Sequence, residues 1–306
     1  MNYLRFCFNC FEILFFMSCG AILCVMAHEF AGLGEPFSNY EKARFVVLSA
    51  PFESTTSYLK GTAAGPAAIL EASGELELYD IELGTTPAER GIATLPQIQC
   101  DGPVEEVIDA IRRKCSKILE DGKFPVVLGG EHTVSLGLHL ALKDFYGDVS
   151  ALHLDAHGDL RDSFEGSRFS HACVMRRIRE HSDAVQAGIR AICEEEAELI
   201  SEEGLKVFYA HEMVEGDLIP DIIGCLGDRV HVTLDLDVLD PSVMPAVGTP
   251  EPGGLGWYGL LGLLKAVAVS REVVGFDMVE LCPRPGLEYA GFTAAKLAYK
   301  MMGFLP

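Results

Sequence analysis

Positive charge is scarce in this chain of 306 residues, which has 24 Lys and Arg against 45 Asp and Glu and a formal net charge of −21. A nucleic-acid partner is therefore not expected, because binding to the phosphate backbone requires a basic surface. An acidic surface attracts cationic substrates and metal ions, but it also simply keeps a protein soluble. The charge alone leaves both interpretations open.

A disulfide framework is also missing. Four of the ten cysteines lie within the first 24 residues, and the other six follow no regular spacing, so we expect isolated thiols of a reducing cytosol. The chain lacks an internal repeat, a low-complexity tract and a Pro/Ser-rich linker. With 49% hydrophobic residues and 31 Gly it can bury a large core, and we predict a single large α/β domain over residues 28–306.

A hydrophobic run long enough to cross a bilayer is absent as well. Residues 13–27 are uncharged, but this segment is shorter than the about 20 residues that a spanning helix needs. It follows Arg5 and ends in Val-Met-Ala, a pattern typical of signal peptides. We favour a start codon that was assigned too early, with synthesis beginning at Met26 in a cytoplasmic protein, over export. A membrane anchor is the least favoured interpretation of residues 1–27.

Apolar runs typical of buried strands alternate with helical patterns along the rest of the chain. The predicted strands are residues 45–50, 124–128, 149–154, 207–210, 230–236 and 273–279. Helices are predicted over residues 103–121, where apolar side chains recur at helical spacing before Asp121-Gly122, and over residues 257–269. This alternation favours a parallel sheet with helices on both faces.

Two segments place metal-binding types of side chain at every second position. The first holds Asp155, His157 and Asp159, and the second holds Asp235 and Asp237. In an extended backbone this spacing puts each set on one side of the chain. Buried carboxylates that repel one another are costly, and cations would remove that cost. We predict a metal site, and a solvated acidic surface is the alternative.

A third segment, GGEH at residues 129–132, follows a short apolar run. The glycine pair lets the backbone turn sharply, and His132 comes at the carboxyl end of a predicted strand, where open α/β sheets bind ligands. Two histidines and four aspartates without a thiolate are too many for one ion and favour a pair of hard divalent ions such as Mn²⁺ over tetrahedral zinc. Two ions roughly 3.5–4 Å apart are typical of two-metal hydrolysis.

The motifs GGEH, DAHGD and DLDVLDP, in this order, resemble those of the ureohydrolase family of arginases and agmatinases, and the prokaryotic agmatinases most closely. The resemblance runs from about residue 42 to the end and includes the segments at 246–254 and 275–280. It implies a three-layer α/β/α fold with a mostly parallel sheet. It also implies a dinuclear manganese enzyme that cleaves a guanidine into urea and an amine, and a homo-oligomer, either a trimer or a hexamer.

The resemblance further implies a role for each site residue. One Mn²⁺ would be bound by His132, Asp155, Asp159 and Asp235, and the other by Asp155, His157, Asp235 and Asp237. His171 would move protons, since an imidazole with a pKa near 6.5 can protonate a departing amine. Glu280 would hold the guanidinium through parallel hydrogen bonds. The structural alternatives are a strand-end carboxylate for Glu280 and a helix N-terminal residue for His171.

Other polar residues are expected to be structural. His139 lies in an amphipathic helix, and we expect His153 on the face of its strand opposite to the ligands. The acidic run at residues 194–196 is interpreted as a solvated helix face.

The predicted substrate is agmatine, hydrolysed to urea and putrescine in polyamine biosynthesis. In arginases an Asn- and Ser-bearing loop holds the α-carboxylate and α-amine of the substrate, and residues 160–172 depart from that pattern. N(1)-aminopropylagmatine, arginine and guanidinobutyrate remain alternative substrates. Asp162 and Glu165 are candidates to meet a distal ammonium group, and a solvated loop is the alternative for them.

Two interpretations from other classes also stay open. A zinc amidohydrolase of the histone-deacetylase kind needs only one metal, and it would leave His132, Asp159 and Asp237 unexplained. A catalytically inactive metabolite-binding protein is the second, although every ligand position of the motifs is filled.

Overall fold

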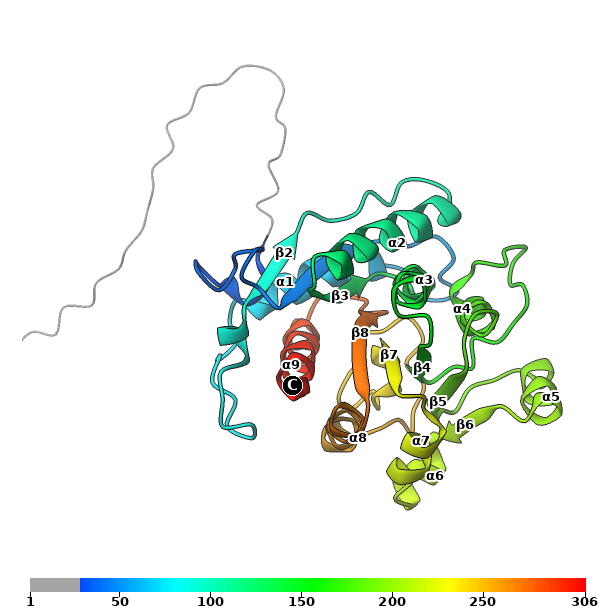
Figure 1. Ribbon diagram of the computed structural model, residues 1–306. Coiled ribbons are helices and arrows are strands. Elements are labelled where there is room, and N and C mark those ends of the chain that lie inside the picture. The colour runs from blue at the N-terminus through cyan, green and yellow to red at the C-terminus, as the bar shows by residue number, and fades with distance from the viewer. Residues whose placement is uncertain (1–27) are drawn as a thin grey trace, which may run out of the picture.

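A single sheet organises the protein, which we describe over residues 28–306 in a computed structural model (Figure 1). Its eight strands follow the order β2-β1-β3-β8-β7-β4-β5-β6, and every neighbouring pair is parallel. The strands are β1 (Phe45–Ala50), β2 (Ile92–Leu95), β3 (Phe124–Gly129), β4 (Ser150–Leu154), β5 (Ala184–Ile189), β6 (Lys206–Tyr209), β7 (Arg229–Asp235) and β8 (Glu272–Val279).

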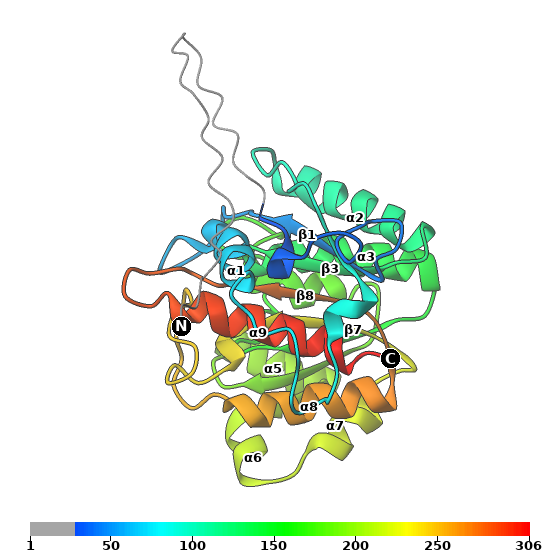
Figure 2. The ribbon, with the colours of Figure 1, turned by 90° about the vertical axis from the view of Figure 1, so that its left-hand side faces the viewer.

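Helices cover both faces of this sheet. They are α1 (Gly65–Ser73), α2 (Val104–Glu120), α3 (Ser135–Tyr146), α4 (Val174–Ile178), α5 (Glu194–Glu203), α6 (Ala210–Glu215), α7 (Ile219–Cys225), α8 (Trp257–Ser270) and α9 (Tyr289–Phe304). Figure 2 shows α9 and α8 side by side across the near face, while α2 and α3 lie on the other. The predicted three-layer α/β/α fold is confirmed.

The two cores are built by the alternation of side chains along the strands. Val47 of β1 packs into the core beneath α1, α8 and α9, whereas its neighbour Leu48 packs into the core beneath α2 and α3. Because both faces are buried, β1 and β3 read as continuous apolar runs rather than as alternating ones.

Most of the predicted elements are present with shifts of one or two residues at their ends. The helices predicted at 103–121 and 257–269 are α2 and α8. The sequence did not predict β2 or β5. Strand β2 has only four residues, and β5 carries Gln186 and Gly188, the latter with φ of +95°, so neither shows a run of apolar residues.

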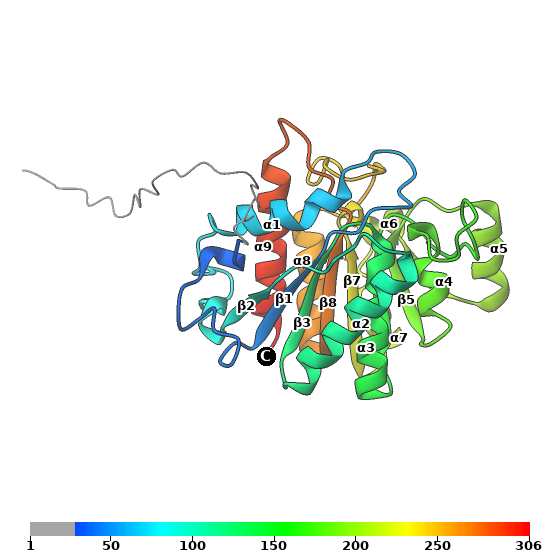
Figure 3. The ribbon, with the colours of Figure 1, turned by 90° about the horizontal axis from the view of Figure 1, so that it is seen from above.

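The four central strands β3, β8, β7 and β4 end at the same edge of the sheet (Figure 3). Parallel strands bring their carboxyl ends together, so the segments that follow them meet there. No helix within residues 28–306 is long and apolar enough to cross a membrane. The apolar segment at 1–27 lies outside the described residues.

Candidate metal centre and active site

All six predicted metal ligands meet at the carboxyl edge of these central strands. Each follows the end of a strand or closes it, and the register of β4 with β7 and of β7 with β8 keeps these ends level. The ligands are His132 after β3, Asp155, His157 and Asp159 after β4, Asp235 at the end of β7, and Asp237 just beyond it.

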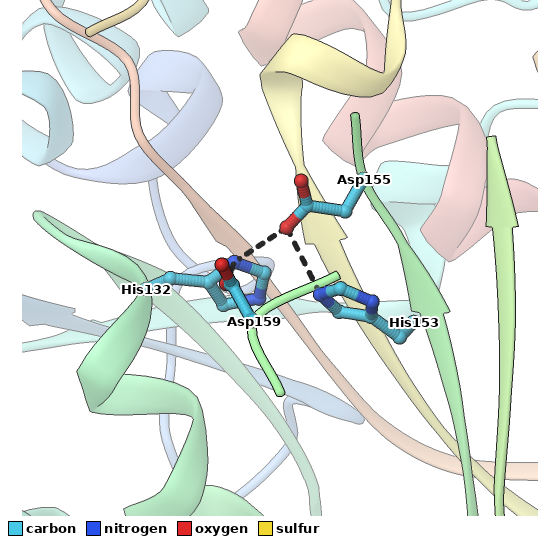
Figure 4. A group of neighbouring side chains, drawn as sticks. All are labelled: His132, His153, Asp155 and Asp159. Atoms are coloured by element: carbon cyan, nitrogen blue, oxygen red, sulfur yellow. Dashed lines mark ion pairs between the residues drawn. The ribbon is translucent and has the colours of Figure 1, made fainter. Parts of the chain in front are cut away.

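One group of carboxylates surrounds the ring of His132. The Nδ1 atom of His132 lies 3.0 Å from Oδ2 of Asp155 and 3.4 Å from Oδ2 of Asp159 (Figure 4). It also lies 3.2 Å from Oδ2 of Asp235. All four side chains are buried. Four atoms of ligand type therefore converge from three different strand ends.

A second group lies next to the first. The Nδ1 atom of His157 is 2.9 Å from Oδ2 of Asp237 and 3.4 Å from Oδ1 of Asp155. Asp155 thus turns one carboxylate oxygen to each group. This arrangement allows it to bridge two ions.

The electrostatics of this cluster fit bound cations. Burial and the like charge of Asp155 raise the pKa of Asp159 well above its ordinary value, and burial with the charges of Asp237 and Asp155 does the same for the pKa of Asp235. Within residues 28–306, Nδ1 of His132 is buried without a hydrogen-bond partner. An orphaned ligand atom and repelling carboxylates are costly by themselves, and divalent ions would satisfy both.

Glu280 follows β8 directly and has a left-handed backbone, with φ of +67°. Its Oε1 atom accepts a hydrogen bond of 2.7 Å from the backbone N–H of His132. Burial and the charge of Glu131 raise the pKa of Glu280 to about 8. Asp159 has a positive φ as well, of +52°. Non-glycine residues in this region are uncommon and cluster at functional sites.

His171 begins the short 3-10 turn His171–Cys173 and lines the same pocket as the cluster. The pocket measures about 280 Å³ and is also lined by Glu280, Glu196 and Glu251. Burial lowers the pKa of His171, so the neutral imidazole prevails in the folded protein. Its ring contacts hydroxyl groups of a loop after β1 and none of the six ligands.

Comparisons with known proteins agree with this geometry. A model of the arginase family matches residues 43–303. An N(1)-aminopropylagmatine ureohydrolase of Synechocystis is 44% identical over 284 residues, which cover 88% of this chain and 92% of that protein. An agmatinase of Pyrococcus horikoshii is 33% identical over 271 residues, or 88% and 94% of the two chains. The solved agmatine ureohydrolase of Thermoplasma volcanium superposes with a TM-score of 0.80 at 34% identity, with 87% and 90% covered.

The chain belongs to the arginase family. The resemblance to ureohydrolases is thereby confirmed, and with it the expected enzyme class, hydrolases of C–N bonds in linear amidines. The family consists of binuclear metal enzymes, which agrees with the two adjoining ligand groups.

In this arginase-family site, the orientation of His132 is fixed by contacts at Nε2, the ring nitrogen that faces away from the cluster. Its Nε2 atom is 2.9 Å from the hydroxyl of Thr233, and Thr233 in turn donates to Oδ1 of the buried Asp277 at 2.8 Å. Because the only hydroxyl hydrogen of Thr233 goes to Asp277, Nε2 of His132 must be the donor. Nδ1 is then left with a free lone pair that points into the cluster.

The same carboxylate is connected to a pair of buried histidines. Oδ2 of Asp277 lies 2.7 Å from Nε2 of His231, and Nδ1 of His231 lies 3.2 Å from Nδ1 of His139. His139 is therefore structural with respect to the metal site, as predicted, although it supports the group that orients His132.

The predicted orientation of His153 was wrong. His153 precedes Asp155 by two residues and so points to the same side of the chain, with Nε2 only 2.9 Å from Oδ2 of Asp155. Gln186 donates from its amide nitrogen to the carbonyl of Gly158 at 2.7 Å and lies 3.0 Å from Nδ1 of His153. Since an amide nitrogen only donates, Nδ1 of His153 accepts, and Nε2–H faces Asp155. His153 is one of the side chains close enough together to hold an ion, and a hydrogen on Nε2 fits the structural role predicted for it, that of orienting Asp155.

The prediction that residues 194–196 form a solvated helix face was wrong for Glu196. Glu196 is buried, and its two oxygens accept from the backbone N–H of Leu160 at 2.8 Å and of Cys193 at 2.9 Å. Helical spacing turns Glu196 inward while Glu194 and Glu195 stay exposed.

The two loop carboxylates suggested for a distal ammonium lie elsewhere. Asp162 is 2.5 Å from the guanidinium of the buried Arg177, and Glu165 is exposed on the loop. Neither lines the pocket with the metal ligands.

Arg190 was not singled out from the sequence at all. Its guanidinium donates to the backbone carbonyls of Asp237 at 2.5 Å and of Glu251 at 2.9 Å. One side chain thus holds the segment of Asp237 and the segment at residues 249–254 together, a role that no motif spacing could have revealed.

Proposed function

We propose that this protein is a manganese-dependent ureohydrolase that cleaves a guanidino amine of the agmatine type, in polyamine biosynthesis, into urea and an amine. The observation that carries the proposal is the meeting of two histidines and four aspartates at the edge of a pocket that the buried Glu280 also lines. Carboxylate and imidazole ligands without a thiolate are the set that Mn²⁺ accepts in preference to tetrahedral zinc.

Each part of the site has a separate role in the proposed reaction. When bound, two divalent ions activate water for attack on a resonance-stabilised guanidinium carbon. Glu280, held by the backbone N–H of His132, presents a carboxylate that pairs with the planar guanidinium and orients it. His171 supplies the proton that the departing amine needs, since the amine is a poor leaving group as an anion.

The lining of the pocket favours a cationic substrate tail. Within residues 28–306, no hydrogen bond or ion pair engages the half-buried carboxylate of Glu251, while its backbone is fixed by Arg190. Both carboxylate oxygens of Glu196, by contrast, accept from backbone N–H groups. Arg161 is the one cationic side chain of the lining that always carries its charge, and its guanidinium stacks over Phe164 at 5.2 Å. Glu251 is thus the carboxylate ready to receive an ammonium group.

Agmatine and N(1)-aminopropylagmatine both carry such a tail. Relatives that are 44% identical to this chain are named N(1)-aminopropylagmatine ureohydrolases. Relatives that are 33% and 36% identical are named agmatinases. Arginine adds an α-carboxylate, which would enter next to Glu251 and be repelled.

A substrate panel tests this proposal. We expect kcat/KM of the Mn²⁺-loaded protein to be highest for the two guanidino amines and at least about 10³-fold lower for arginine and guanidinobutyrate. Glu251→Gln should lower kcat/KM for the amines by about 10–100-fold, the value of a hydrogen bond to a charged group. Glu198→Gln, which changes the same charge on the exposed side of α5, is the control. Equal kcat/KM for arginine and the amines would contradict the proposed specificity.

We also propose that the protein acts in the cytoplasm. All six cysteines within residues 28–306 are free thiols, which suits a reducing compartment. Cell fractionation with N-terminal sequencing of the mature protein tests this, and recovery of a chain cleaved near Ala27 outside the cytoplasm would overturn it.

The oligomeric state that we propose is a trimer or a hexamer, on the resemblance to ureohydrolases alone. Light scattering on the purified protein measures the mass directly, and a monomer over the whole concentration range would contradict it.

A further inference from the structure

Glu131, the residue before the metal ligand His132, is buried and points away from the metal cluster. Its Oε2 atom accepts from the backbone N–H groups of Ser54 at 2.6 Å and Thr55 at 2.7 Å, on the loop that follows β1. Its Oε1 atom accepts from the hydroxyl of Thr55 at 2.7 Å and from that of Thr133 at 3.0 Å. Every contact to this carboxylate is therefore a donor.

Thr55 lies between this carboxylate and His171. Its hydroxyl oxygen is 3.1 Å from Nδ1 of His171 and accepts the backbone N–H of His171 at 3.0 Å. A hydroxyl has one hydrogen, and Thr55 donates it to the carboxylate of Glu131, which can only accept. The oxygen of Thr55 can then only accept from the ring, so Nδ1 of His171 carries the hydrogen.

The other contacts of the ring agree with this assignment. Nε2 of His171 is 2.9 Å from the hydroxyl of Ser57, which is exposed and lines the pocket. The hydroxyl of Ser170 is 3.3 Å from Nδ1, and it can accept as well as donate. Nε2 is thus the ring nitrogen that faces the pocket, and it holds the free lone pair.

We propose that Glu131 and Thr55 form a positioning pair that fixes the tautomer of His171, with the hydrogen on Nδ1 and the lone pair of Nε2 on the pocket side, where it takes up the proton that the attacking water releases. This inference rests on the proposed function, in which His171 then delivers that proton from Nε2 to the departing amine. An imidazole in the opposite tautomer would turn a hydrogen-bearing nitrogen to the pocket when it should accept a proton, and the proton would have to be redistributed before each turnover.

The loop after β1 that Glu131 holds also forms part of the pocket wall. At the other end of this loop, Glu53 accepts from the backbone N–H groups of Gly61 at 2.8 Å and Ala63 at 3.1 Å, so a carboxylate holds each end. Ser57 and its neighbours Thr56 and Tyr58, which line the pocket, are carried by it. The loop that contacts the imidazole is therefore fixed by the residue next to a metal ligand.

Nitrogen-15 NMR of histidine-labelled protein tests the tautomer without substrate. The protein is loaded with diamagnetic Zn²⁺, and the signals of His171 are assigned by their loss in His171→Asn. We expect a protonated Nδ1 and an unprotonated Nε2 in the wild type, and a shift toward the other tautomer in Thr55→Val, which keeps the shape of the side chain but has no hydroxyl. Thr55→Ser should keep the wild-type spectrum.

Kinetics of the Mn²⁺-loaded variants give the second readout. We expect Thr55→Val to lower kcat by about 10–100-fold, the usual effect of losing such a supporting partner, with KM and metal content close to the wild type, and Thr55→Ser to recover most of kcat. Thr293→Val, at a half-buried position of α9 that does not line the pocket, is the control for the same substitution.

A wild-type spectrum with the hydrogen on Nε2 would overturn the inference, and so would a tautomer that is unchanged in Thr55→Val. Loss of metal in Thr55→Val with the tautomer retained would overturn it too, because the hydroxyl would then serve the metal site. These outcomes are independent of which substrate is turned over, so a failure of the proposed function is recognised separately.

Discussion

Removing the metal should make the stability of this protein depend on pH in a direction that the structure fixes. Burial and the charge of Glu131 raise the pKa of Glu280 to about 8 in the metal-free protein. Between its ordinary value and pH 8 the folded state therefore keeps a proton that the unfolded chain has lost. Stability falls with rising pH wherever the unfolded state binds fewer protons.

Other ionisable groups of the cluster also make the metal-free protein less stable as the pH rises above 7. The pKa values of Asp159 and Asp235 are raised by burial and by neighbouring carboxylates. Burial lowers the pKa of His132 and of His157, but neighbouring aspartates outweigh it and raise both. Burial lowers the pKa of His171, so its imidazole is largely neutral in both states at this pH and adds little slope. Neighbouring histidines outweigh burial and hold the pKa of Asp155 well below its ordinary value, so Asp155 is ionised in both states.

The expected effect of raising the pH from 7 to 8 is a loss of about 1 kcal/mol from Glu280 alone, since a full proton corresponds to about 1.4 kcal/mol per pH unit. That is about 2–4 °C in Tm for a chain of this size, and the other groups add to it. Thermal unfolding after treatment with EDTA, at pH 7 and pH 8, measures the change.

Two controls make this result specific. Glu280→Gln should make the slope of the metal-free protein shallower, because the glutamine cannot titrate but can still accept from the backbone of His132. Reloading with Mn²⁺ should largely abolish the slope, because cations take the place of the protons. A metal-free protein that is equally stable or more stable at pH 8 would refute the assigned electrostatics.

Three further predictions concern single side chains. Asp235→Ala should fold but lose its metal and its activity, and two tightly bound Mn²⁺ per chain in this variant would contradict the assignment of Asp235. His171→Ala should keep its metal while kcat falls by roughly 10²–10⁴, whereas loss of metal would make His171 a ligand. Thr233→Val removes the acceptor that orients His132 and should weaken Mn²⁺ binding by about 10–100-fold, measured by competition with a chelator; unchanged affinity would show that Asp277 and Thr233 have no influence on the ligand.

The parts of the site that the sequence predicted are those with short spacing. Asp155, His157 and Asp159 alternate within one segment, and Asp235 and Asp237 within another, so their common side follows from the backbone alone. That the two segments meet could be inferred because strands of a parallel sheet end at one edge. The same alternation, applied correctly, would have placed His153 beside Asp155.

The partners that orient the site could not be found in this way. Thr55 and Glu131 are 76 residues apart, and Thr233 and His132 are 101 apart, so only the folded chain brings them together. Glu196 and Arg190 lack a motif, and their burial depends on packing that has no local signal. Strands β2 and β5 escaped prediction because tertiary pairing, rather than apolar content, makes them strands.

The most direct test of the central claim titrates metal-free protein with Mn²⁺ while urea and amine are measured with agmatine and with N(1)-aminopropylagmatine. We predict that activity reaches its maximum when two Mn²⁺ are bound per chain, and that urea and the amine appear in equal amounts. Maximal activity with a single bound ion, or two bound ions with no urea from either guanidino amine, would contradict a dinuclear ureohydrolase centre built from these residues.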